Sequence, residues 1–74
     1  MSFVVLIYVD GMLISVDKFK TKERAIKYLE SLGFENNEQR GRVIRFNSDD
    51  SYAEIVPKEL HDIRKKLKKQ NKLL

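Results

Sequence analysis

Residues 3–16 read FVVLIYVDGMLISV, and this stretch decides the fold. Two runs rich in β-branched and other apolar residues flank the dipeptide Asp10-Gly11. Asp-Gly between such runs favours a type I′ turn, because both residues tolerate positive φ and the twist of the turn matches that of the strands. We therefore expect a β-hairpin with a two-residue loop, whose register pairs Val9 with Met12, Ile7 with Ile14 and Val5 with Val16.

The pattern changes to that of a helix after Thr21, whose hydroxyl can cap the first turn, with Glu23 placed where the helix dipole favours an acid. The apolar residues that follow have helical spacing and predict one buried stripe: Ala25, Ile26, Leu29 and Leu32. Gly33 suits the left-handed position that ends a helix. Residues 35–41 are polar without an apolar period, which predicts a loop.

A second hairpin is expected from residues 42–46 and 52–56, joined by a polar loop. The register that brings apolar residues to one face pairs Ile44 with Ile55, Phe46 with Ala53, Arg45 with Glu54 and Asn47 with Tyr52. The opposite charges of Arg45 and Glu54 support this register.

Pro57 is suited to the first turn of a second helix, expected over about residues 57–72. Leu60, Ile63 and Leu67 follow at the spacing of a core stripe. The order ββαββα predicts a single α+β domain over residues 1–74. In it, a four-stranded antiparallel sheet carries both helices packed on one face.

Composition excludes several classes of chemistry. The 74 residues include no cysteine and one histidine, His61, so neither disulfides nor a zinc set is expected. The glycines are too scattered for a phosphate-binding loop, and no spacing brings a nucleophile, a base and an orienting group together. We expect no catalytic residues, no metal site, no cofactor and no enzymatic activity.

The apolar run Phe3–Val9 does not have the pattern of a targeting segment. It lacks a positively charged region before it and a small-residue cleavage site after it. It is also far shorter than the roughly 20 residues needed to span a bilayer as a helix. A cytoplasmic location is the expectation.

The second face of the predicted sheet has no helix to cover it and is the first candidate surface. The exposed sheets of soluble proteins are usually polar on their solvent side, whereas this one is largely apolar. Its predicted members are Val4, Leu6, Tyr8, Leu13, Val43, Arg45, Tyr52 and Val56. Such a face can seat a protein partner or a second copy of the chain, which would make a homo-oligomer, or its tyrosines can stack nucleic-acid bases. We favour the protein interface.

The second helix is the other candidate surface, because residues 58–74 contain seven Lys and Arg against two Asp and Glu. This segment therefore carries +5 and residues 1–57 carry −1, so the whole basic excess behind the net charge of +4 belongs to this helix. The candidate phosphate-binding residues are Arg64, Lys65, Lys68, Lys69 and Lys72. Such residues can bind nucleic acid without sequence preference, or can simply keep a surface helix soluble. Membrane attachment is not expected, since the apolar side of the helix is narrow and lacks Trp and Phe.

Together these features predict a small non-enzymatic module that acts by protein–protein contact or self-association through its apolar sheet face. The alternative is a nucleic-acid-binding protein that uses the basic helix. Small chains of this kind are common among the accessory proteins of phages and mobile elements, and we expect this protein to be one.

Overall fold

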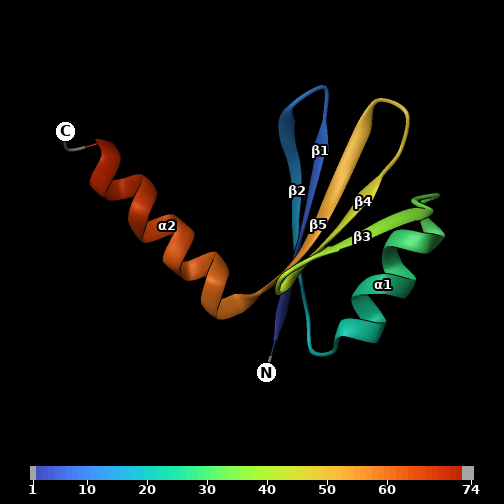
Figure 1. Ribbon diagram of the computed structural model, residues 1–74, viewed down its shortest axis with the longest axis horizontal. Helices are drawn as coiled ribbons and strands as arrows, with labels where there is room; N and C mark the ends of the chain where they lie inside the picture. Colours follow the sequence, from blue (N-terminus) through green and yellow to red (C-terminus); the bar gives the residue numbers. More distant parts are fainter. Residues whose placement is uncertain (1, 73–74) are drawn as a thin grey trace.

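The protein is an α+β fold built on one five-stranded antiparallel sheet, with strand order β2-β1-β5-β4-β3 (Figure 1). The computed structural model describes residues 2–72, except for the side chains of residue 36 and of residues 68–72. The elements are β1 (Phe3–Val9), β2 (Met12–Phe19), α1 (Lys22–Ser31), β3 (Asn36–Arg40), β4 (Val43–Asn47), β5 (Ser51–Pro57) and α2 (Lys58–Lys72). The predicted fold class is therefore confirmed in outline, with one more strand than expected.

The first hairpin turns where the sequence predicts. Asp10 and Gly11 have φ values of 51° and 79°, as a type I′ turn requires, and Val9 pairs with Met12. The rest of the predicted register is wrong, because the register shifts between Ile7 and Tyr8. The resulting pairs are Tyr8 with Leu13, Ile7 with Ser15, Leu6 with Val16 and Val5 with Asp17.

This β-bulge moves one further apolar side chain to the second face of the sheet. Val16 lies opposite Leu6 on that face, whereas Asp17 turns toward α1, where its carboxylate accepts a 3.4 Å hydrogen bond from the Tyr28 hydroxyl. Phe19 follows on the same side and packs on the Tyr28 ring, with 5.1 Å between ring centroids. Contacts with α1 thus favour the bulged register over the regular one.

The second hairpin confirms its predicted register in full. Ile44 pairs with Ile55, Arg45 with Glu54, Phe46 with Ala53 and Asn47 with Tyr52. Beside it, residues 36–40 form β3 rather than the predicted loop, and pair with β4 across a turn at Gly41. The error arises because an edge strand exposed on both faces can be polar throughout, so its side chains show no apolar period.

Helix α1 covers the first face of the sheet. The Thr21 hydroxyl accepts a 3.2 Å hydrogen bond from the Arg24 amide, which confirms the predicted cap, and Gly33 ends the helix with φ of 96°. The buried side chains that α1 and this face share are Val5, Ile7, Ala25, Leu29, Phe34, Ile44, Phe46, Ala53 and Ile55. This cluster is the main core of the protein.

Helix α2 does not join α1 on that face, so the predicted packing of both helices on one side is wrong. Leu60 in its first turns packs against a separate cluster on the second face, formed by Val4, Leu6, Val43 and Val56. Beyond that point α2 diverges from the sheet (Figure 1). The Cα radius of gyration is 12.7 Å, larger than the roughly 11 Å of a compact chain of this length, as a projecting helix implies.

The two helices lie on opposite sides because the second face is apolar at the end nearest Pro57, and α2 buries that end. Pro57, the last residue of β5, is buried and passes directly into α2. The helix can therefore cover only the part of the face nearest its own start. The part of the second face nearer the hairpin turns stays open, and the candidate site lies there.

Candidate functional site

The predicted apolar sheet face divides into a buried and an open part. Four of its eight predicted members are at most 7% exposed, and these are Val4, Leu6, Val43 and Val56. They are covered by Leu60 and by one another, so the expectation that all eight form an open surface is corrected. The remaining four are less buried and lie nearer the hairpin turns: Tyr8, Leu13, Arg45 and Tyr52.

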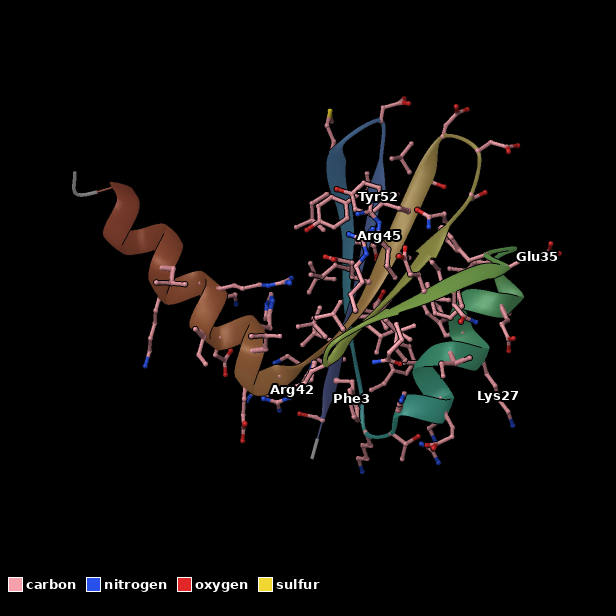
Figure 2. All side chains as sticks on the ribbon, in the orientation of Figure 1. Phe3, Lys27, Glu35, Arg42, Arg45 and Tyr52 are labelled. Atoms are coloured by element: carbon pink, nitrogen blue, oxygen red, sulfur yellow. The ribbon has the colours of Figure 1, made fainter. Side chains whose placement is uncertain are left out.

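Three of these side chains form a stacked row across β1, β5 and β4. The Tyr8 and Tyr52 rings stack with 4.6 Å between centroids and 15° between planes. The Arg45 guanidinium carbon lies 4.2 Å from the centre of the Tyr52 ring, and Figure 2 shows the two side chains together on the sheet. Because β5 lies between β1 and β4, Tyr8 and Arg45 occupy opposite faces of the Tyr52 ring.

Glu54 faces Arg45 across the strands, but its carboxylate is directed to α2 instead. Its Oε1 atom lies 3.5 Å from Nη1 of Arg64, a contact that joins the second turn of α2 to β5. The Arg45 Nε atom is buried and has no hydrogen-bond partner among the described residues. Arg45 is thus held by stacking on Tyr52, whereas Glu54 helps to fix the angle of α2.

A groove of about 400 Å³ opens between α2 and the second face of the sheet. We call it the α2 groove. Its floor is formed by Leu6, Tyr8 and Leu13, and its helical wall by His61, Arg64, Lys65 and Leu67. The floor is therefore apolar apart from the Tyr8 hydroxyl, and the helical wall is mostly basic.

Exposed apolar side chains gather on the two elements that border this groove. Among the described residues, seven large hydrophobic side chains are about half exposed or more, and six of them belong to β2 or α2. These six are Met12, Leu13, Ile14, Val16, Ile63 and Leu67. Ile63 and Leu67 thus do not form the core stripe that their spacing predicts, because α2 leaves the sheet after Leu60.

The positively charged residues that line the groove belong to α2. The pKa of His61 is lowered from its ordinary value of 6.5, first by desolvation and then by the positive charge of Lys65, with smaller contributions from Arg64 and Lys18. Asp62 opposes this effect. Lys18 is in β2, opposite Val4 on the second face of the sheet, and does not line the groove.

The Tyr8 hydroxyl on the groove floor stays protonated. Burial raises its pKa above 10.0, and the negative charge of Glu54 adds to the effect. At neutral pH this hydroxyl is accordingly available as a hydrogen-bond donor to a bound group.

Of the predicted phosphate-binding residues, Arg64 and Lys65 are exposed on α2 and line the groove. Lys68, Lys69 and Lys72 have side chains outside the described residues. Sequence reasoning missed His61, Leu67 and Val16 as members of this surface. The bulge hides Val16 from any pattern of alternation, and the direction of α2 decides the placement of the other two.

No group of three or more His, Cys, Asp or Glu residues in the described part of the chain is arranged to hold a metal ion. Among residues 2–72, neither helix combines the length and the apolar character needed to cross a bilayer. No known protein family, curated protein or solved structure shows significant similarity to this chain.

Proposed function

We propose that this protein is a non-enzymatic interaction module that binds another protein, or a second copy of itself, through the α2 groove and the adjoining surface of β2. The observation that carries the proposal is the exposure of hydrophobic side chains on the groove side of β2 and α2, namely Leu13, Val16 and Leu67. Small soluble domains rarely leave large contiguous apolar patches open unless the patch has a partner. Tyr8 and Arg45 beside the patch are of residue types enriched at protein interfaces.

The stacked row supports a protein partner over nucleic-acid bases. A base stacks on a free aromatic face, yet both faces of the Tyr52 ring are taken, one by Tyr8 and the other by Arg45. A base could stack on Tyr52 only by displacing one of these contacts. The row is better suited to a rigid platform whose edges and hydroxyl groups contact a partner.

Site-specific photocrosslinking tests this proposal in the cells that produce the protein. A benzophenone amino acid at position 13 replaces an exposed leucine on the groove floor, and the same replacement at Leu32 is the matched control. Leu13 is 50% exposed and Leu32, at the end of α1, is 51% exposed. We expect a discrete covalent adduct from position 13 alone, with twice the mass of the chain in the case of self-association. Equal adducts from both positions, or none from position 13, would contradict the proposal.

The second candidate function is nucleic-acid binding by α2, which is favoured by the exposure of Arg64 and Lys65 on a helix with seven bases and two acids. It predicts binding of fluorescently labelled single-stranded DNA or RNA that weakens steeply as salt is raised. Neutralising Lys65, Lys68, Lys69 and Lys72 together is expected to abolish that binding. An absence of binding at low salt would end this alternative. The expectation of a phage or mobile-element accessory protein stays a prediction.

A further inference from the structure

We infer that the occupant of the α2 groove is an acidic amphipathic helix of another protein, with its apolar side on the sheet and its carboxylates toward α2. This inference rests on the proposed function and names the partner's chemistry. Two observations support it. The floor of the groove is apolar whereas its helical wall is basic, and the backbone groups of β1 in the floor are already hydrogen-bonded.

The floor and the helical wall together determine which side chains the bound segment must present. Leu6 and Leu13 on the floor offer apolar contact. On the helical wall, His61 has a pKa below 6.5 and is mostly neutral at pH 7, Arg64 is paired to Glu54, and Lys65 supplies the positive charge. Lys18 of β2 adds positive charge on the same face of the sheet, although it does not line the groove. A segment that fills this space needs apolar side chains on one side and negative charge on the flank next to Lys65, because unlike charges across an interface favour the correct orientation.

The floor sets the backbone conformation of the occupant. Strand β1 is paired on both sides, with β2 and with β5, so its backbone N–H and C=O groups are already used. A segment lying on this face receives no main-chain hydrogen bonds from the sheet. It must satisfy its own backbone groups, and an α-helix does so within itself. The span from His61 to Leu67 is about 9 Å of helix, which matches somewhat less than two turns of a helical partner.

A second copy of this chain is a poor occupant on grounds of charge. Its α2 carries seven basic residues against two acidic ones, and its α1 carries three against two. The apolar residues of α1 are, in addition, already packed in the main core. Neither helix brings the negative charge that the groove favours, so the occupant belongs to a different protein.

The test uses the full chain labelled with ¹⁵N and three synthetic helix-forming peptides of about 18 residues, a length at which isolated helices become appreciably populated. The peptides share one leucine stripe and differ at the polar positions, which are Glu, Gln or Lys. We expect the Glu peptide to shift the amide signals of Leu6, Tyr8, Leu13 and residues 61–67 saturably. The Gln peptide is expected to bind about tenfold more weakly, and the Lys peptide not at all, since a few rim charge pairs together supply a factor of this size.

Two pairs of variants, each a groove variant with a closely matched control, test whether the peptide binds in the groove. Lys65→Glu reverses a charge on the groove wall, and Lys66→Glu makes the same change on an exposed neighbour that does not line the groove. Leu67→Ala shortens a groove residue that is 54% exposed, and Leu32→Ala shortens one that is 51% exposed on α1. We expect Lys65→Glu to weaken binding of the Glu peptide at least fivefold more than its control Lys66→Glu does. The same difference is expected between Leu67→Ala and its control Leu32→Ala.

The outcomes separate this inference from the proposed function. Binding of the Gln or Lys peptide in the groove, without preference for Glu, overturns the acidic partner but leaves a protein-binding groove. Concentration-dependent shifts of the same signals, with dimers in sedimentation, assign the groove to a second copy. If no peptide shifts the groove signals and the chain stays monomeric, both proposals fail. Displacement of the Glu peptide by single-stranded DNA assigns the surface to nucleic acid instead.

Discussion

Shortening Leu60 to alanine is expected to release α2 while leaving most of the fold intact. Leu60 is the apolar side chain that packs α2 onto the second face, and it is only partly buried, whereas Leu29 of α1 is fully buried in the main core. Fully buried leucines lose about 3–5 kcal/mol on truncation to alanine. We therefore expect about 3–4 kcal/mol for Leu29→Ala and about 1–2 kcal/mol for Leu60→Ala, since part of the Leu60 side chain is already in water.

These losses can be measured against a total stability of about 4–11 kcal/mol for a domain of this length. Urea unfolding of both variants gives the free energy of unfolding, and amide hydrogen exchange shows which region opens. With Leu60 shortened, α2 retains the exposed ion pairs of Arg64 with Glu54 and of Glu59 with Arg42, and the 3.0 Å hydrogen bond from the Lys58 amide to the Ser2 carbonyl. Exposed ion pairs contribute about 0–1 kcal/mol, too little to hold a helix in place.

Exchange should therefore accelerate across residues 60–67 in Leu60→Ala while β1 and β5 stay protected. In Leu29→Ala we expect faster exchange throughout the sheet, because the main core opens with global unfolding. The two clusters are not energetically separate if Leu60→Ala lowers the free energy of unfolding as much as Leu29→Ala, or if it leaves the exchange of α2 unchanged.

Three further predictions concern local features. Gly11→Ala should lower the free energy of unfolding, measured with urea, by about 1 kcal/mol, because φ is 79° at this position. No atom lies within 4 Å of the added Cβ, so the loss would come from backbone strain, and an unchanged urea midpoint would exclude that strain. Thr21→Ala should cost about 1 kcal/mol by loss of the cap to the Arg24 amide, with Thr21→Ser as the variant that retains it. His61 has a pKa below 6.5 in the folded protein, chiefly through desolvation and then Lys65, so the unfolded chain binds the proton more readily. Stability should therefore fall as the pH drops through about 6.5, and the fall should be smaller in His61→Gln, as the difference between their urea midpoints at pH 7.5 and 5.5 measures; equal falls would contradict this assignment.

Local patterns in the sequence determined both hairpin turns, α1 with its cap, and the complete register of the second hairpin. The Asp10-Gly11 turn needs only two residues that accept positive φ, and the pairing of Ile44 with Ile55 follows from alternation and one loop length. Helix α1 begins at a hydroxyl cap and ends at a glycine. Each of these features depends on residues close together in the chain, which is why a local pattern can predict it.

The tertiary structure alone decided the candidate site. The bulge beside Ile7 is favoured by contacts between β2 and α1, and it moves Val16 to the second face. The pairing of β1 with β5 joins the two hairpins and brings Tyr8 onto Tyr52, two residues far apart in sequence. Most of all, the periodicity of α2 predicts which residues share its side but not which face of the sheet it covers or at what angle it leaves. Those are set chiefly by the apolar cluster under Leu60, since packing of distant elements depends on shapes that no single segment contains.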